Sequence, residues 1–333
     1  MTAPPVADLL AGLRVVAIPM AVPFRGVTTR EVALIEGPAG WGEFGPFPEY
    51  EPPEAARWLT AAIESAYAAW PAPVRCAIAV NATVPAVPAD RVPAILARFP
   101  GCTTVKVKIA QAGQHLADDI RRVERVRREL GPDARIRLDA NGALTVGEAA
   151  LALKALAAFD IDYVEQPVET LAELRALRAE LARARVEMRV AADEAIRKAD
   201  DPLRVDLTGL ADLLVLKVAP SGGIRRALRI VAAHGLPVVV SSALDTSIGI
   251  AAGAALAAAL PELDGACGLG TLALMDGDVC AASMTATRGW VVPRRVSPDE
   301  DLLDRYAAPP DRIAWWRRRV VACREHLGRA DAR

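Results

Sequence analysis

The chain has 333 residues, of which 53% are hydrophobic and 24% are charged. This composition excludes a largely disordered chain and can form a large buried core. With 40 basic and 41 acidic residues, the formal net charge is -1, so no overall field favours nucleic acid or a membrane surface. At about 150 residues per domain, we expect about two domains.

The apolar stretches are too short to span a membrane. The longest, Ile248 to Leu260, ends at Pro261 and falls short of the roughly 20 residues that a span needs. The N-terminus lacks a basic region followed by a long apolar core, so we expect no secretory signal. The five cysteines are scattered and form no CxxC, which indicates a reducing, cytoplasmic setting.

Residues 1–75 predict a small α+β domain. Arg14–Met20 and Thr29–Ile35 have the composition of two strands, and Glu54–Trp70 has helical spacing. Between them, "GPAGWGEFGPFPEY" is dense in Gly and Pro and predicts an ordered loop.

From about Cys76, short apolar runs alternate with amphipathic helical stretches. The predicted strands are Ala77–Ala82, Thr104–Ile109, Ile136–Asp139, Tyr163–Glu165, Met188–Asp193, Leu213–Lys217 and Val238–Ser241. The predicted helices include Leu116–Leu130, Val146–Ala158, Leu171–Ala184 and Ile224–His234. Such alternation predicts a parallel sheet with crossover helices, and seven runs favour a closed (β/α) barrel of the TIM type over residues 76–285.

Polar residues end one predicted strand after another. They are Lys106 and Lys108, Asp139 and Asn141, Glu165, Asp193 and Glu194, Lys217, and Ser241 and Ser242. They recur every 24 to 31 residues, about the length of one βα unit. Because the carboxyl ends of parallel strands open on one face of a barrel, we expect these side chains to form one ring.

Three of these residues, Asp139, Glu165 and Asp193, are carboxylates from consecutive strands. Carboxylates crowded together repel one another unless a cation lies between them. Their hard oxygen atoms suit Mg²⁺ or Mn²⁺. The alternative is three independent surface salt bridges, which consecutive strand ends disfavour.

Lysines flank the carboxylates on both sides. Lys106 and Lys108 share one face of a strand, while Lys217 lies beyond the acids. Neighbouring positive charge lowers the pKa of a lysine, which can then act as a base near neutral pH. Such a base can remove a proton next to a carboxylate if a metal ion stabilises the negative charge of the enediolate that forms. The alternative is that Lys106 and Lys108 are exposed lysines of an edge strand.

Several segments resemble, in order, the barrel motifs of the enolase superfamily: "VKVKIA", "RLDANGAL", "YVEQP", "AADEAI", "LKVAPSGGI" and "VSSALDTSIG". The last two, and "WGEFGPFPEY", are most similar to the o-succinylbenzoate synthase family of the menaquinone pathway. The resemblance extends over nearly the whole chain. It implies that residues 1–75 cap the barrel and that residues 286–333 pack back on this cap.

The resemblance also implies roles for site residues. Asp139, Glu165 and Asp193 would ligate Mg²⁺, with Asn141 and Glu194 supporting these ligands. Lys108 would remove the α-proton of a succinyl-hydroxycyclohexadiene carboxylate and then help the hydroxide leave, a syn elimination of water. Lys217 would lie over the other ring face, and Lys106 would orient the carboxylate and tune Lys108.

Candidate substrate contacts are less specific. Ser221, Gly222 and Gly223 open a predicted helix, whose free N–H groups suit a carboxylate, although a simple turn and N-cap explains them equally. Ser241 and Ser242 could bind the succinyl arm. The loop Pro23–Val27 resembles the segment of the capping domain that closes such sites, and its Arg25 is a candidate substrate contact.

Other activities share this fold. An N-succinylamino acid racemase would use both Lys108 and Lys217. A dipeptide epimerase usually has an acid at the last strand end, which "CGLGTL" lacks. Muconate cycloisomerase and a non-catalytic metal-binding barrel remain alternatives. A dinucleotide-dependent oxidoreductase is disfavoured because no GxGxxG follows the first strand.

Overall fold

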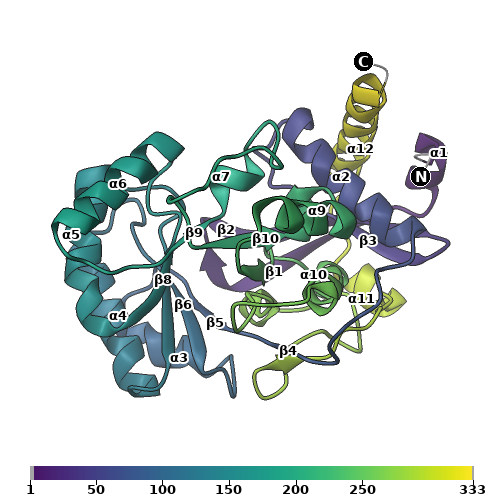
Figure 1. Cartoon of the computed structure of the whole chain (residues 1–333). Helices are drawn as coiled ribbons and strands as arrows, with labels where there is room; N and C mark the ends of the chain where they lie inside the picture. Colours follow the sequence, from purple (N-terminus) through teal and green to yellow (C-terminus); the bar gives the residue numbers. More distant parts are fainter. Residues whose placement is uncertain (1–3, 332–333) are drawn as a thin grey trace.

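The computed structural model describes residues 4–331, which form a barrel of parallel strands and helices with a smaller N-terminal unit packed on it (Figure 1). At the N-terminal end, β1 (Arg14–Phe24), β2 (Val27–Gly37) and β3 (Gly40–Phe44) form an antiparallel sheet in the order β1-β2-β3. Helix α2 (Pro52–Tyr67) packs against this sheet. We call β1 to β3 with α2 the capping unit.

The glycine-rich segment expected to be a loop contains strand β3, so that expectation was wrong. The glycines of this segment allow helix α2 to pack closely against strand β3, in addition to forming turns. A Cβ atom at Gly42 would lie 2.0 Å from the Ala62 carbonyl oxygen of α2, so only glycine lets the helix lie this close to the strand.

The barrel sheet has seven parallel strands in the order β11-β10-β9-β8-β7-β6-β5. They are β5 (Ala82–Val84), β6 (Thr104–Lys108), β7 (Arg135–Asp139), β8 (Ile161–Glu165), β9 (Val190–Ala192), β10 (Leu213–Lys217) and β11 (Val238–Ser241). Cys267 and Gly268 join its two edges, through parallel bridges to Val80 and Ser241. The predicted TIM-type (β/α) barrel is therefore confirmed.

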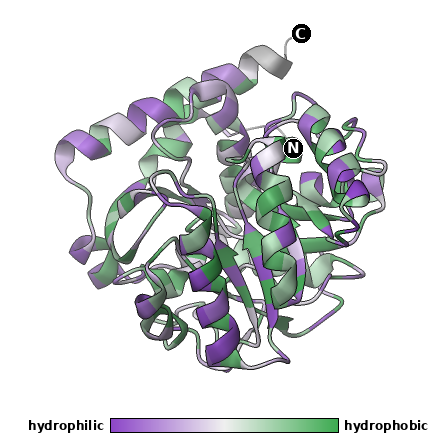
Figure 2. Cartoon of the chain, turned by 90° about the vertical axis from the view of Figure 1, so that its left-hand side faces the viewer, coloured by the Kyte–Doolittle hydropathy of each residue, from purple (hydrophilic) through white to green (hydrophobic). Residues whose placement is uncertain are grey.

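Helices cover the outside of the barrel. They are α3 (Val92–Leu96), α4 (Leu116–Leu130), α5 (Val146–Leu156), α6 (Leu171–Arg183), α9 (Ile224–His234) and α10 (Ser247–Ala259). The short helices α7 (Glu194–Arg197) and α8 (Val218–Ser221) follow β9 and β10, and α8 packs on α2 of the capping unit. Thr145 and Thr170 begin α5 and α6 with capping boxes to Glu148 and Glu173. Figure 2 shows hydrophobic residues on the central strands and hydrophilic ones on the outer helices.

One predicted strand was misplaced. Ala77–Ala82 was expected as a single barrel strand, but β4 (Ile78–Ala79) pairs antiparallel with β12 (Trp290–Val291), and the barrel strand begins at Ala82. The chain changes partners in between, because the Val80 N–H binds the Gly289 carbonyl and the next N–H, of Asn81, binds Cys267. Periodicity cannot locate such a switch.

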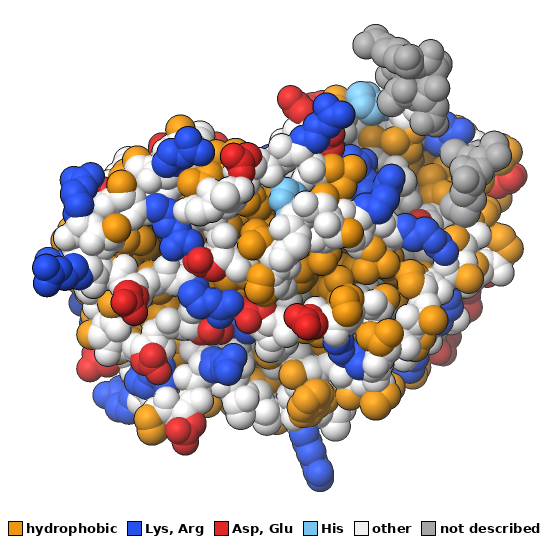
Figure 3. All heavy atoms as spheres, viewed as in Figure 1, with side chains coloured by type: hydrophobic (Ala, Val, Ile, Leu, Met, Phe, Trp, Pro, Cys, Tyr) orange, Lys and Arg blue, Asp and Glu red, His pale blue; other side chains and the backbone are white. Residues whose placement is uncertain are grey.

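The C-terminal segment returns to the capping unit. Helix α11 (Glu300–Arg305) follows the barrel, and α12 (Pro310–Asp331) packs on α2, beside α1 (Val6–Ala11). The rings of Phe44 and Trp316 meet edge to face with centroids 5.6 Å apart. In Figure 3 acidic and basic side chains are interspersed over the visible face, in keeping with the near-neutral composition. Within residues 4–331, no helix is long and apolar enough to cross a membrane.

Candidate active site

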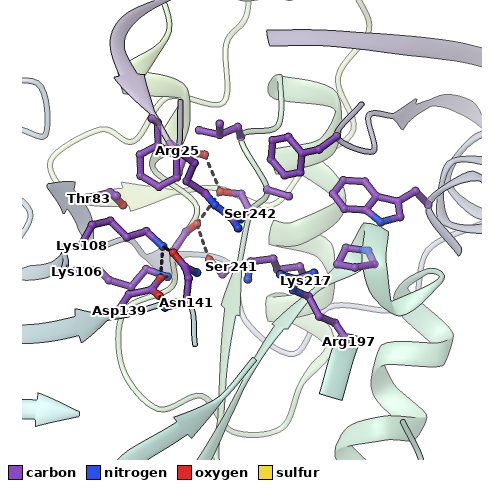
Figure 4. A pocket seen from close by; sticks show the side chains of 18 of the residues that line it. Arg25, Thr83, Lys106, Lys108, Asp139, Asn141, Arg197, Lys217, Ser241 and Ser242 are labelled. Atoms are coloured by element: carbon purple, nitrogen blue, oxygen red, sulfur yellow. Dashed lines mark hydrogen bonds and ion pairs between the residues drawn. The ribbon is translucent and has the colours of Figure 1, made fainter. Parts of the chain in front are cut away.

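The charged residues predicted from strand ends meet at one end of the barrel, beneath the capping unit. Lys106 and Lys108 lie on β6, Asp139 ends β7, Glu165 ends β8, Asp193 follows β9, and Lys217 ends β10. Figure 4 shows Lys108 and Lys217 on opposite sides of the cavity. Neighbouring parallel strands bring these ends together: Lys108 is in register with Asp139, and Asp139 with Glu165.

The three carboxylates are linked through lysine ammonium groups. Lys106 Nζ lies 2.8 Å from Glu165 Oε2 and 3.3 Å from Asp139 Oδ2. Lys217 Nζ pairs with Asp193 and lies 4.0 Å from Glu165 Oε1. Lys108 pairs with Asp139 from the other side. Positive charge therefore stands between each pair of neighbouring acids.

Burial and charge displace the pKa values of the two β6 lysines in opposite directions. Burial alone would lower the pKa of Lys106, but the charges of Glu165 and Asp139 outweigh it and hold the pKa above its usual value. For Lys108, burial prevails over the attraction of Asp139, and the charge of Lys106 lowers the pKa further. Two lysines whose pKa values differ in this way suit different roles: Lys106 that of a permanent cation, and Lys108 that of a base.

The carboxylates differ in the same way. Burial and the charge of Asp139 raise the pKa of Glu165 to about 7. Burial would also raise the pKa of Asp139, but Lys108 and Lys106 hold it below its usual value. The pKa of Asp193 is likewise lowered, because Lys217 and Arg197 outweigh burial.

A second layer of hydrogen bonds surrounds these groups. Lys108 Nζ donates to Asn141 Oδ1 at 2.7 Å, and Asn141 Nδ2 donates to Glu194 Oε1 at 3.3 Å. Arg197 binds Glu194 at 2.8 Å and approaches Asp193 Oδ1 at 3.4 Å. Asn141, Glu194 and Arg197 thus connect Lys108 to Asp193 around the ring of strand ends.

The lysines open into a cavity between barrel and capping unit. Its polar wall comes from barrel strand ends, including Asn141 and Ser242. Its apolar wall is formed by Phe24, Phe47, Tyr50, Trp58, Pro220 and Leu244. A cavity with charge at one end and aromatic rings at the other suits a small anion with an apolar part.

Comparisons with known proteins agree with this geometry. Residues 94–296 match the family model "Enolase C-terminal domain-like", and residues 15–66 match "Enolase N-terminal domain-like". The chain is 55% identical over 317 residues to the o-succinylbenzoate synthase of Mycobacterium ulcerans (strain Agy99), covering 95% of this chain and 94% of that one. It is 56% identical over 321 residues to that of Mycobacterium tuberculosis (strain ATCC 25177 / H37Ra), covering 96% of both. The chain belongs to the o-succinylbenzoate synthase family of the enolase superfamily.

Solved structures with lower identity share the fold of this o-succinylbenzoate synthase family member. Muconate lactonizing enzyme from Pseudomonas fluorescens has a TM-score of 0.73 at 21% identity, over 89% of this chain and 98% of that one. Dipeptide epimerase from Enterococcus faecalis V583 has a TM-score of 0.69 at 23% identity, over 86% and 96%. At these identities the likeness concerns the fold alone.

Enolase-superfamily enzymes, the o-succinylbenzoate synthase family among them, generally use a divalent metal. Within the described part of the chain, no three His, Cys, Asp or Glu side chains converge on one point, because ammonium groups lie between the acids. The donor set nevertheless fits a cation. Glu165 Oε1 is buried without a hydrogen-bond partner, and Glu165 lies between Asp139 and Asp193 along the sheet.

Some predicted substrate contacts lie elsewhere. Ser221, Gly222 and Gly223 are not among the residues that line the cavity. The N-terminus of α9 faces Glu64 of the capping unit, whose Oε1 accepts from the Arg225 N–H at 3.2 Å. A Cβ atom at Gly223 would lie 1.9 Å from Glu64 Oε2, so this glycine makes room for a protein carboxylate.

Other predicted contacts do line the cavity. Ser241 and Ser242 reach it from the end of β11, and the Ser242 hydroxyl donates to the Gly268 carbonyl at 2.8 Å. Arg25 lies at the tip of the β1–β2 hairpin, in a two-residue turn with Gly26, at φ 53° and 79°. The expected loop Pro23–Val27 is therefore mostly strand.

Sequence reasoning missed several cavity residues. They are Thr83, Tyr50, Trp58, Arg197, Leu244 and Thr271. Thr83 lies on β5, whose position was misjudged, and Arg197 could have been found because it follows Asp193 by one helical turn. Tyr50 and Trp58 carried no signal, since no spacing rule relates the capping unit to the barrel.

Proposed function

We propose that this protein catalyses the o-succinylbenzoate synthase reaction of menaquinone biosynthesis. In this reaction, 2-succinyl-6-hydroxy-2,4-cyclohexadiene-1-carboxylate loses water to give 2-succinylbenzoate. The observation that carries the proposal is the pair Lys108 and Lys217 on opposite sides of one cavity, flanking three strand-end carboxylates, in a chain 55% identical to o-succinylbenzoate synthases.

In the proposed site, Asp139, Glu165 and Asp193 hold Mg²⁺ or Mn²⁺, since hard oxygen donors suit these ions. When bound, the ion supplies positive charge beside the substrate carboxylate. Asn141 supports Asp139, whose Oδ1 accepts from the Asn141 N–H at 3.1 Å, and Glu194 supports Asp193 through Arg197.

Lys108 acts as the base in this proposal. Its lowered pKa favours the neutral amine, which takes the proton from the ring carbon that carries the carboxylate. The electron pair moves into the ring, the ring C–O bond breaks, and the Lys108 ammonium returns the proton to the leaving hydroxide as water. The ring becomes aromatic, and Lys108 ends neutral, as it began.

The other lysines play supporting parts. Lys106, whose pKa is raised, stays an ammonium that orients the substrate carboxylate and adds to the charge next to Lys108. Lys217 lies across the cavity, where its ammonium faces the opposite side of the ring. Arg25, Ser241 and Ser242 are candidate contacts for the succinyl arm, while Ser221, Gly222 and Gly223 follow Pro220, which lines the cavity.

We also propose the domain division at residues 75 and 285, with residues 286–333 belonging to the cap. The packing of α12 on α2 and the salt bridge between Arg312 and Glu31 support it. The family-model matches, to residues 15–66 and 94–296, lie close to this division.

A second candidate, N-succinylamino acid racemase, is favoured by the same two opposed lysines. A racemase needs one base on each face of the α-carbon, and Lys108 and Lys217 could provide both. Dehydration by the same active site needs only Lys108 as a base.

An absorbance assay with the succinyl-hydroxycyclohexadiene carboxylate and Mg²⁺ tests the proposal directly. We expect rapid dehydration, measured beside deuterium exchange into N-succinylamino acids by NMR. Exchange without dehydration would favour the racemase. Neither reaction, in a folded and metal-loaded protein, would reject both.

A further inference from the structure

One residue of the cavity wall has an unusual backbone. Leu244 lies in the loop that joins β11 to α10, at φ 61°, in the left-handed region that leucine rarely adopts. Its side chain is 2% exposed and lines the cavity. A conformation of this kind persists only where surrounding contacts enforce it.

Arg30, from strand β2 of the capping unit, makes one of these contacts. Its side chain is 1% exposed, and its Nε donates to the Leu244 carbonyl at 2.9 Å. Its terminal nitrogen donates to the Gly45 carbonyl, and the guanidinium lies 4.7 Å from the ring centroid of Phe47. Arg30 thus fixes the strained residue to two points of the capping unit.

Glu43, from the adjacent strand β3, binds the same loop two residues later. Its carboxylate accepts from the Thr246 N–H at 3.1 Å, the Thr246 hydroxyl at 2.5 Å and the Gly249 N–H at 3.1 Å. Thr246 is the N-cap of α10. Glu43 therefore ties the start of a barrel helix to the capping sheet.

We propose that Arg30 and Glu43 are positioning residues that hold residues 242–246 in the conformation that presents Leu244 to the cavity. Arg30 and Glu43 do not touch the substrate themselves. They act by fixing the position of Leu244 in the apolar wall that the substrate contacts. The inference rests on the proposed function only for the identity of that substrate. Leu244, Phe47 and Trp58 form an apolar wall. In the proposed substrate, the methylene groups of the succinyl arm suit contact with this wall.

Glu64 provides a matched control. It also belongs to the capping unit and also meets the N-terminus of a barrel helix, α9, through the Arg225 N–H. It does not line the cavity, and neither does Arg225. Removing Glu64 should loosen an equivalent interdomain contact without moving Leu244.

The test compares Glu43→Ala, Glu43→Gln and Glu64→Ala in the metal-loaded protein. The first readout is hydrogen exchange of peptides covering residues 242–250. The second is inhibition by 2-succinylbenzoate and by benzoate, which lacks the arm. For Glu43→Ala we expect faster exchange, about tenfold weaker inhibition by 2-succinylbenzoate, unchanged inhibition by benzoate, and a KM effect larger than the kcat effect. Glu43→Gln, which keeps an acceptor, should restore all of these.

Equal effects of Glu43→Ala and Glu64→Ala on exchange and inhibition would overturn the inference, as would equal weakening of both inhibitors. If Glu43→Ala does not fold, Arg30→Lys, which keeps the charge but not both hydrogen bonds, carries the same expectations. If the wild-type protein neither dehydrates the diene nor binds 2-succinylbenzoate, the proposed function fails. The exchange data then still decide whether Arg30 and Glu43 hold the loop.

Discussion

Glu165 is hydrogen-bonded through only one of its two oxygens: Oε2 lies 2.8 Å from Lys106 Nζ, while the buried Oε1 has no hydrogen-bond partner and lies 4.0 Å from Lys217 Nζ. A fully buried carboxylate oxygen without a hydrogen bond is costly, and a cation in direct contact with it would remove that cost. Burial and the charge of Asp139 also raise the pKa of Glu165 to about 7. This relationship is the strongest local reason to expect a cation among the three acids.

Removing the metal should therefore abolish activity, and Glu165→Gln should weaken metal binding. We expect the affinity for Mn²⁺, measured by electron paramagnetic resonance without substrate, to fall about 10- to 100-fold or more. Glu124→Gln, an exposed position on α4, is the control and should bind Mn²⁺ normally. Full activity in excess chelator would eliminate the metal assignment.

Lys108→Ala should lower kcat by several orders of magnitude, about 10²- to 10⁴-fold at least, because the proposed base is lost. Mn²⁺ binding should persist, since the three acids remain. Lys154→Ala, at an exposed position on α5, should leave kcat unchanged. Near-normal turnover by Lys108→Ala, followed by absorbance, would show that another group removes the proton.

Lys217→Ala should lower kcat by about 10²-fold, because the cation opposite Lys108 is lost while the base remains. Any exchange of the α-proton of N-succinylamino acids should then be confined to one enantiomer. Proton NMR in deuterium oxide measures this. Exchange of both enantiomers at equal rates would mean that Lys217 does not serve the second face.

Glu43→Gln should change how stability depends on pH. Burial and the charge of Asp245 raise the pKa of Glu43 to about 8, against the opposing effects of Thr246 and Arg30. Between about pH 4.5 and 8 the native state therefore holds a proton that the unfolded state has released, so this group makes stability fall as pH rises. Glutamine does not titrate, and the fall should be smaller by up to about 1.4 kcal/mol per pH unit.

Urea unfolding of both proteins between pH 5 and pH 8 measures this difference. The two stability curves should diverge in favour of Glu43→Gln toward pH 8. Because Asp245 also has a raised pKa through burial, Asp245→Asn serves as a second comparison. Parallel curves for wild type and Glu43→Gln would show that Glu43 titrates normally.

The sequence by itself determined the barrel and its charged ring. Alternating apolar runs and helices define parallel strands, and a parallel barrel must gather its strand ends on one face. Lys106, Lys108, Asp139, Glu165, Asp193 and Lys217 could thus be grouped from spacing alone, and the structure places them together. Their regular spacing made this possible, because each βα unit repeats the same local geometry.

Only the tertiary structure decided how the cap meets the barrel. Trp58 enters the cavity from α2 and Tyr50 from the segment between β3 and α2, and the docking of this unit follows no periodicity. Glu64 occupies the α9 N-terminus, which the sequence offered as a candidate substrate contact, while Arg30 donates to the Leu244 carbonyl and Glu43 accepts from Thr246. These contacts join residues about 160 to 210 positions apart, so no local pattern encodes them. Long-range packing, rather than local propensity, sets the apolar side of this site.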